Sequence, residues 1–251
     1  MVILKSEEEI EQIRQSNMIV AEILAGLAEL VKPGVRTIDL DAYAEEGARR
    51  KGAVPAFKGY RGYPFSLCTS MNEEVVHGMP SDRELKEGDI ISLDFGIFYK
   101  GFYGDAALTA AVGQISANAA RLIAVTRESL AAAIKNVRPG NRIGDVSSAV
   151  QRCVETAGYS VVRDFVGHGI GRELHEEPPV PNYGRKGRGI ELKEGMVLAI
   201  EPMVNEGSYE VKVKEDEWTV VTRDGKLSAH FEHTVAVTSR GAIVLSAVDG
   251  N

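Results

Sequence analysis

Four stretches of the chain repeat apolar residues every three or four positions, which is the spacing of an amphipathic helix. The first begins after Ser6, whose spacing to Glu9 is typical of a capping box, and it ends before Pro33–Gly34. Three further helices are expected over residues 37–52, 119–137 and 143–158. In the second helix we expect three side chains to face the interior: Leu40, Tyr43 and Ala44.

Alternating apolar and polar residues predict strands in the segments between and after these helices. The clearest is residues 89–98, where every second residue from Ile91 to Ile97 is apolar. Further strands are expected over residues 102–112, 160–165, 196–201, 218–222, 231–237 and 242–245. Two helices with strands are thus followed by two more helices with strands. This order predicts an α+β fold of two similar αβ halves with a mainly antiparallel sheet.

The organisation of the chain is that of one globular domain. Its content of 44% hydrophobic and 26% charged residues is ordinary for a soluble protein, and its length can bury a sizeable core. There is no sequence repeat, low-complexity tract or long linker, so we expect residues 1–251 to form a single domain. The Pro-rich residues 178–184 are expected to form a stiff surface loop and not a domain boundary.

Charge and composition disfavour several function classes. Acidic residues outnumber basic residues 36 to 29, whereas nucleic-acid binders usually carry a net basic face. The apolar runs are only a few residues long, well below the ~20 that a membrane span needs, and the N-terminus has too short an apolar run for a signal peptide. Cys68 and Cys153 form no CxxC pair and predict free thiols in a reducing cytoplasm.

The predicted hairpin around Lys100–Gly101 carries the most informative chemistry. With these two residues in the turn, Gly96 lies opposite Asp105, and Asp94 lies opposite Ala107. The two carboxylates then share a sheet face as diagonal neighbours, with Cα atoms about 7–8 Å apart. Buried carboxylates repel one another unless a positive group lies between them, and a divalent cation is the simplest such group. The alternative is that one Asp is a turn or capping residue and the other pairs with an arginine.

Two glutamates in the second half extend this acidic group. Glu201 ends the apolar run 196–200, and Pro202 favours an extended backbone that delivers the glutamate to a largely buried surface. Glu232 lies in a predicted strand and shares a face with Thr234 and Ala236. A buried Glu–Arg pair is the alternative for each glutamate, although few arginines lie close to either one in the sequence.

The histidines supply candidate nitrogen ligands and acid–base groups. His168 lies between two glycines that let a ligand approach, and imidazole is a common metal ligand. A dinucleotide-binding loop is disfavoured there because no strand–turn–helix unit surrounds it. His175 opens a segment similar to the H-E-x-x-H zinc motif, but Pro179 stands where the second histidine would be. Taken alone, His77 is an ordinary loop histidine, and His233 is expected to be structural.

Together these segments resemble the methionine aminopeptidases of the shorter, type I kind, over essentially the whole chain. The resemblance is carried by GYRGYP at 59–64, NEEVVHGMP at 72–80, LDFG at 93–96, GFYGD at 101–105, GHGIG at 167–171, AIEP at 199–202 and FEHT at 231–234. It implies the pita-bread fold, in which two αβ halves are related by a pseudo-twofold axis and the helices lie on the outer face.

The resemblance also implies a site for two divalent metal ions with five protein ligands: Asp94, Asp105, His168, Glu201 and Glu232. In the family pattern Asp105 and Glu232 bridge both ions, Asp94 completes one site, and His168 with Glu201 completes the other. One imidazole and four carboxylates suit Co, Mn, Fe(II) or Zn ions. The implied activity is removal of the initiator methionine from nascent proteins with a small second residue, by a metal-activated water molecule.

Further roles follow from the same resemblance. His175 is implied to hydrogen-bond the scissile carbonyl oxygen, His77 to contact the amide nitrogen, and Glu201 to carry a proton from the water to the leaving amine. The walls of the methionine pocket are implied to include Tyr60, Tyr63, Cys68 and Trp218. Two positions depart from the family pattern and affect the fine shape of this pocket: Leu174, where an aromatic residue is common, and Phe57, where a cysteine is frequent.

Two rival functions remain open at this point. One is an Xaa-Pro aminopeptidase or prolidase of the same fold, and the other is a binding protein that keeps the fold without catalysis. The resemblance implies a cytoplasmic monomer whose partner is the N-terminal methionine of nascent chains, with no nucleic-acid or membrane binding. A transient contact with the ribosome is compatible with it, although the sequence shows no zinc-finger extension or basic tail that would serve for docking.

Overall fold

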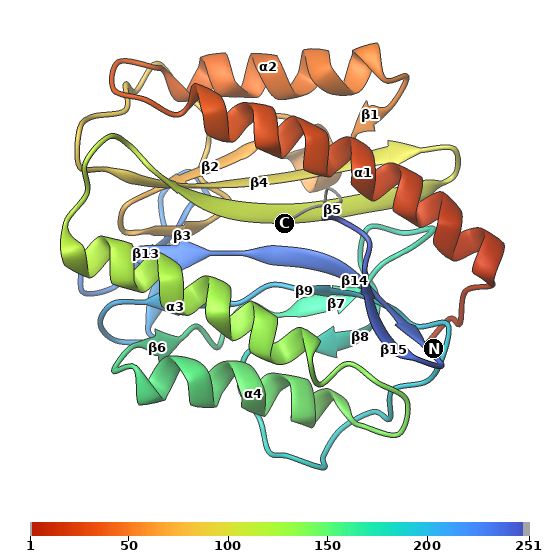
Figure 1. Ribbon diagram of the computed structural model, residues 1–251. Coiled ribbons are helices and arrows are strands. Elements are labelled where there is room, and N and C mark those ends of the chain that lie inside the picture. The colour runs from red at the N-terminus through yellow and green to blue at the C-terminus, as the bar shows by residue number, and fades with distance from the viewer. Residues whose placement is uncertain (1, 248–251) are drawn as a thin grey trace.

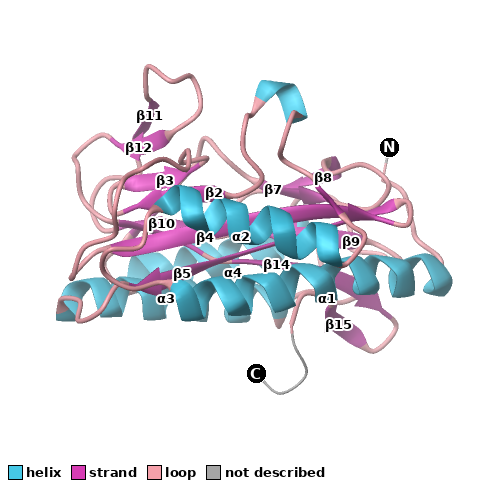
Figure 2. Ribbon diagram, turned by 90° about the horizontal axis from the view of Figure 1, so that it is seen from above, coloured by secondary structure: helices cyan, strands magenta, loops and turns pink. Residues whose placement is uncertain are grey.

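The computed structural model describes residues 2–247, which form a curved antiparallel sheet covered by helices (Figure 1). Figure 2 shows helices along one face of the sheet, while the hairpin of β11 (Val211–Val213) and β12 (Val220–Thr222) and the short helix η1 (Tyr60–Gly62) stand on the other face. The helices are α1 (Glu7–Leu30), α2 (Thr37–Arg50), α3 (Ala117–Ile134) and α4 (Ile143–Thr156), with the 3-10 helix η1 at Tyr60–Gly62. Within residues 2–247, no helix is long and apolar enough to cross a membrane.

The main sheet has nine strands in the order β1-β4-β5-β14-β9-β7-β8, and β2 and β15 pair with β4 and β14. Every pairing in it is antiparallel. Its strands are β1 (Val54–Pro55), β2 (Cys68–Met71), β4 (Ile90–Tyr99), β5 (Phe102–Ala111), β7 (Gly167–Gly169), β8 (Glu176–Val180), β9 (Val197–Ile200), β14 (Glu232–Thr238) and β15 (Gly241–Val244).

Two smaller sheets of three strands each flank the main sheet. One contains β13 (Ser228–His230), β10 (Met203–Asn205) and β6 (Ser160–Val161). The other contains β11 (Val211–Val213), β12 (Val220–Thr222) and β3 (Glu74–Val76). In each half of Figure 1 a pair of helices lies in front of its own strands, and the halves meet where β5 pairs with β14. The predicted α+β class and the two-half organisation are therefore confirmed.

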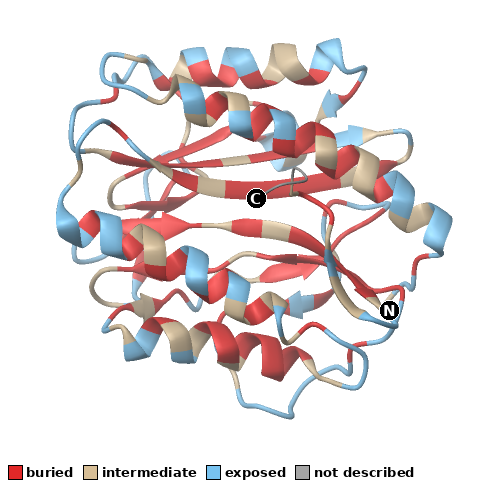
Figure 3. Cartoon of the chain, viewed as in Figure 1, coloured by how far each residue is buried: buried red, intermediate tan, exposed pale blue. Residues whose placement is uncertain are grey.

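The hydrophobic core also follows the two halves of the fold, and the buried faces of the helices are turned towards the strands (Figure 3). One cluster joins α1 and α2 to β4 and β5, and the other joins α3 and α4 to β9 and β14. The capping box of Ser6 and Glu9 begins α1 as expected. At Gly104 on β5, an added Cβ would lie 2.7 Å from the carbonyl carbon of Ser16, so this glycine permits the close approach of α1 to the sheet.

Two expectations are wrong. Tyr43 is 41% exposed and does not face the interior; its hydroxyl instead packs against Gly26 of α1, in the space that a Cβ at this position would need. Residues 178–180 belong to β8, so only residues 181–184 of the expected loop lie outside a strand. Their prolines fit there since β8 ends the sheet order, and an edge strand tolerates residues that lack an N–H group. Short strands such as β2 and β7 offer too few residues for an alternating pattern to show.

Candidate functional site

The hairpin of β4 and β5 has the register expected from the sequence. Gly96 pairs with Asp105, and Asp94 pairs with Ala107, so the two carboxylates share one face of the sheet. The register continues into the second half, because Ala107 also pairs with Glu232 on β14. Asp94 and Glu232 therefore flank the same residue of β5 from opposite sides, with Asp105 two positions further along.

His168 and Glu201 reach this place from the neighbouring strands. His168 on β7 pairs with Ala199 on β9, and Ala199 pairs in turn with Thr234 on β14. Glu201 directly follows β9. The Thr234 hydroxyl donates a hydrogen bond to the Asp105 carbonyl oxygen at 2.8 Å, which ties β14 to β5 beside the carboxylates. The pairing of five strands thus gathers residues that lie up to 138 positions apart in the chain, from Asp94 to Glu232.

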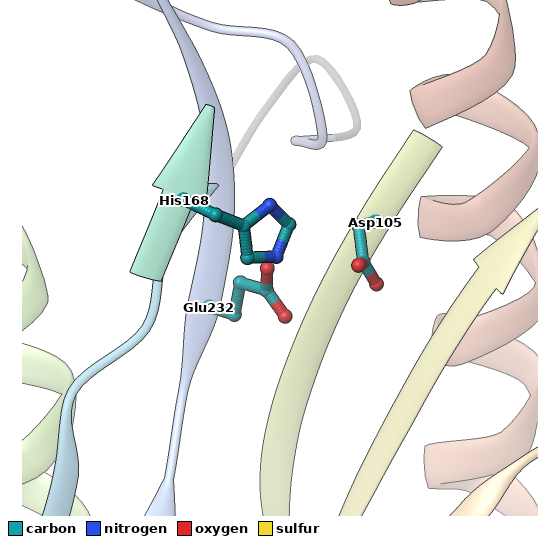
Figure 4. Close-up of side chains that lie close together, drawn as sticks. All are labelled: Asp105, His168 and Glu232. Atoms are coloured by element: carbon teal, nitrogen blue, oxygen red, sulfur yellow. The ribbon is translucent and has the colours of Figure 1, made fainter. Parts of the chain in front are cut away.

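The geometry fits a metal cation. Asp105, His168 and Glu232 point towards one another in Figure 4, and one ligand atom from each lies within 4.8 Å of the others. Nε2 of His168 lies 3.7 Å from Oε1 of Glu201. Within residues 2–247, one buried carboxylate oxygen of each of Asp94, Asp105 and Glu232 lacks a hydrogen-bond partner. Buried polar atoms without a partner are costly, and a divalent cation would satisfy all three.

The alternative of buried acid–arginine pairs fails among the described residues. The ion pairs of residues 2–247 include none between an arginine or lysine and any of the four clustered carboxylates. Burial raises the pKa of Asp94 to about 7. Burial, and then the neighbouring carboxylates, raise the pKa values of Asp105, Glu201 and Glu232 well above the usual range. Four acids that resist ionisation together are a strong attractor for positive charge.

His168 has the tautomer that a metal ligand needs. Its Nδ1 lies 2.9 Å from the Gly169 carbonyl oxygen, which can only accept, so Nδ1 carries the proton and Nε2 keeps a free lone pair. Burial lowers the pKa of His168 to about 3, so the ring is neutral at physiological pH. The contact between His168 and Glu201 is therefore no ion pair; the two side chains offer neighbouring ligand atoms instead.

We expect the Asp94→Asn variant to become more stable relative to the wild type as the pH rises from about 4 to about 7, both proteins being held in a chelator. A carboxyl whose pKa is raised by folding binds its proton more tightly in the folded state, so its ionisation lowers the free energy of unfolding across this window. The difference should reach roughly 3–4 kcal/mol and then level off.

Urea unfolding of both proteins at several pH values measures this difference. The buried histidines contribute to the free energy of unfolding of both proteins, and their lowered pKa values make that free energy rise with pH. This contribution cancels in the difference between the two proteins. An unchanged difference across the window would show that Asp94 does not titrate as its burial demands.

The other two predicted histidines line the same cavity. Nδ1 of His175 lies 2.9 Å from the Tyr60 hydroxyl, and its ring is 4.3 Å from that of His168 between centroids. His77 adopts a left-handed backbone with φ of 59° and packs edge-on against Phe165 and Trp218. Burial lowers the pKa of His77 to about 4, and it also lowers that of His175, with a contribution from the charge of Arg61. Both rings are therefore neutral near pH 7.

The cavity has a volume of about 170 Å³ and extends from the carboxylates towards η1 and the loop before β12. Its apolar walls contain all four residues expected there, together with the two departures from the family pattern: Tyr60, Tyr63, Cys68, Trp218, Phe57 and Leu174. Cys68 on β2 pairs directly with Asp94 on β4, so this part of the apolar cavity wall lies next to the clustered carboxylates. A wider, more open groove of about 530 Å³ beside α4 contains none of the candidate residues.

The structure also places residues at the site that the sequence alone did not single out. His230 is 1% exposed, its Nε2 lies 3.8 Å from Oε2 of Glu201, and this nitrogen has no hydrogen-bond partner in the described chain. His230 could have been found from the sequence, because it precedes Glu232 by two residues, and side chains two positions apart in an extended chain point to the same side. Asn182 donates to the Glu201 carbonyl oxygen at 3.0 Å, and Arg61 lines the cavity. His233, in contrast, contacts Ser246 at 2.8 Å.

Comparison with known proteins gives a consistent picture. The sequence model of metallopeptidase family M24 matches residues 11–239. The methionine aminopeptidase of Clostridium acetobutylicum is 55% identical over 98% of this chain and 99% of its own length. The crystal structure of the methionine aminopeptidase from Thermotoga maritima has a TM-score of 0.97 and 48% identity, covering 99% of this chain and all of that one. A prolidase from Pyrococcus horikoshii shares the fold with a TM-score of 0.81, but at 24% identity and over 65% of its chain.

Proposed function

This chain belongs to metallopeptidase family M24, and from this premise we propose that it removes the N-terminal methionine of proteins and peptides whose second residue is small. The pita-bread fold expected for such an enzyme is confirmed by the match to the Thermotoga structure. The observation that carries the proposal is a group of buried carboxylates without partners, which opens into an apolar cavity lined by aromatic rings. Cations bind the first feature, and a methionine side chain fits the second.

Family membership implies the use of divalent metal, and the residues present fit it. We propose that Asp94, Asp105, His168, Glu201 and Glu232 would hold two such ions. Co, Mn, Fe(II) and Zn all suit this set of one imidazole and four carboxylates. When bound, such ions supply a Lewis acid and a nucleophilic water at neutral pH.

The chain's own residues then position the peptide and move its protons. Nδ1 of His175 lies 2.9 Å from the Tyr60 hydroxyl. In the tautomer in which this hydroxyl donates to Nδ1, the ring proton is on Nε2, which can donate to the scissile carbonyl oxygen as negative charge develops there. Glu201 accepts a proton from the attacking water and delivers it to the leaving amide nitrogen. His77, at the cavity wall, contacts that nitrogen.

The cavity determines which residue is removed. Tyr63 and Trp218 pack edge-on with ring centroids 5.1 Å apart, and Cys68 adds a buried sulfur beside them. Aromatic rings and sulfur are favourable neighbours of a flexible thioether. Phe57 and Leu174 complete the lining and set its width. We propose that the methionine side chain occupies this space with its α-amine towards the carboxylates.

Hydrolysis of Met-Ala-Ser tests the function directly. We expect the metal-reconstituted wild-type protein to release methionine and the Asp94→Ala variant to release almost none. Asp82→Ala is the matched control, because Asp82 is an exposed carboxylate outside the cavity and should not affect hydrolysis. Release of free methionine is followed by chromatography with Mn, Co, Fe(II) or Zn added separately. A wild-type protein that is inactive with all four ions would overturn the proposal.

The two rival functions have less support. The prolidase from Pyrococcus horikoshii shows only the shared fold at 24% identity, whereas the methionine aminopeptidase relatives match over their whole length. A binding protein without catalysis would have no need for a complete set of clustered ligand residues. A preference for Xaa-Pro peptides over Met-Ala peptides in the same assay would favour the prolidase function.

We also propose that residues 1–251 form one catalytic domain, of which 1 and 248–251 lie outside the described residues. The proposed setting is a cytoplasmic monomer that acts on nascent chains, with at most a transient ribosome contact and no nucleic-acid binding. The excess of acidic residues, 36 against 29 basic ones, is compatible with that absence. The free state of Cys68 and Cys153 is compatible with a reducing compartment.

A further inference from the structure

We propose that Arg61 selects substrates with a carboxylate shortly after the second residue, so that acidic nascent chains are processed faster than basic ones. This inference rests on the proposed function and adds a charge preference to it. Arg61 lies in η1, lines the cavity, and is exposed. Of the cavity-lining residues in the described chain, it alone carries a permanent positive charge.

The guanidinium of Arg61 is free to bind a substrate. Within residues 2–247 it takes part in no ion pair or hydrogen bond, and its Cζ lies 5.4 Å from the centroid of the Tyr60 ring. The neighbouring cation Lys58 differs, because it is bound at 2.8 Å to Glu45 and does not line the cavity. A planar guanidinium is well suited to a carboxylate because it can donate two parallel hydrogen bonds.

The backbone at Arg61 is held in an unfavourable conformation. Its φ of 50° and ψ of 22° are left-handed, between Gly59 and Gly62, which also have positive φ values. For a residue with a side chain this conformation is unfavourable, whereas glycine would adopt it freely. A strained arginine at the rim of a cavity is the kind of outlier that indicates function. The turn places Arg61 at the lining of the cavity.

The direction of the bound peptide brings its later residues to this rim. With the α-amine at the carboxylates and the methionine side chain in the cavity, the rest of the chain must leave towards the exposed edge. Arg61 of η1 both lines the cavity and is exposed, so it lies at that edge. The shared chemistry is a carboxylate, which an acidic side chain at the third or fourth residue supplies in a protein, and which the free C-terminus supplies in a tripeptide.

The experiment compares amidated tetrapeptides of the type Met-Ala-X-Ser and Met-Ala-Ser-X, with Asp, Ser or Lys at X. For the wild-type protein at low salt we expect kcat/KM to be about three- to tenfold higher with Asp than with Lys, mainly through KM. The preference should decrease as salt is added. It should disappear in Arg61→Gln and reverse in Arg61→Glu. Met-Ala-Ser with a free or an amidated C-terminus separates the two sources of the carboxylate.

Lys58→Gln is the matched control, since it removes an exposed cation close in sequence that already has a partner. It should keep the wild-type preference. Equal kcat/KM values for Asp and Lys peptides in an active wild-type protein, or a preference that survives in Arg61→Glu, would overturn this inference while leaving the proposed function intact. Failure to release methionine from every peptide would instead overturn the proposed function, and this inference with it.

Discussion

Replacing Asp105 with asparagine is expected to stabilise the protein in a chelator and to destabilise it relative to wild type when divalent metal is present. In the chelator the variant has one fewer carboxylate in a buried group whose members raise one another's pKa values. With metal present, the order reverses because the variant loses a ligand in the proposed site. Few substitutions change the sign of their effect with one solution component, so this result would be specific for a cation site.

The expected size of the metal effect is large. One ion bound at 100 times its Kd adds about 2.7 kcal/mol to the free energy of unfolding, so two ions add about 5.4 kcal/mol. This exceeds the roughly 3–4 kcal/mol expected from removing one buried carboxylate in the chelator, and most of the increment should appear in the wild type only. Removal of groups that merely support metal ligands lowers metal affinity about 10- to 100-fold, so removal of a proposed ligand should lower it at least that far. Methionine release should fall below detection.

Thermal unfolding and titration calorimetry, each with and without Mn, measure these quantities for Asp105→Asn. Asp82→Asn serves as a control, since Asp82 is an exposed carboxylate outside the cavity. Equal stabilisation of Asp105→Asn and wild type by metal would contradict the assignment of Asp105 as a ligand.

Replacing His77 with alanine is expected to lower kcat by about 10²- to 10⁴-fold, which is the usual contribution of one acid–base group. His77 lines the cavity and packs against Trp218, but its ring contacts aromatic neighbours and is not among the three clustered ligand residues. Metal affinity should therefore stay within a few-fold of the wild-type value. This separation of turnover from metal binding distinguishes a group that acts on the peptide from a ligand.

Steady-state kinetics and calorimetric metal titration of His77→Ala test this separation. His233→Ala is the comparison variant, because His233 contacts Ser246 away from the cavity; it should affect stability more than kcat. A His77→Ala protein that loses its bound metal would show that His77 is itself a ligand, and the proposed role at the amide nitrogen would then be wrong.

The helices and the central hairpin were predictable from local patterns. The capping box at Ser6 and the two-residue turn at Lys100–Gly101 each specify geometry over a few residues, and both were confirmed. Tyr43 was misplaced because its environment depends on Gly26, a residue of another helix. The edge strand β8 was missed because prolines usually indicate loops, and only the sheet order shows that an unpaired edge accepts them.

The candidate site, too, was predictable from the sequence only in part. The placement of Asp94 and Asp105 on one face of the sheet follows from alternation and a tight turn, which the sequence alone determines, and the family resemblance named all five candidate ligands. Only the tertiary structure decided that β14 lies beside β5, which places Glu232 opposite Ala107, and that His230 and Arg61 lie at the same site. Neighbouring residues determine short-range backbone geometry. The pairing of strands that are distant in the sequence depends instead on how the two halves bury their apolar faces together.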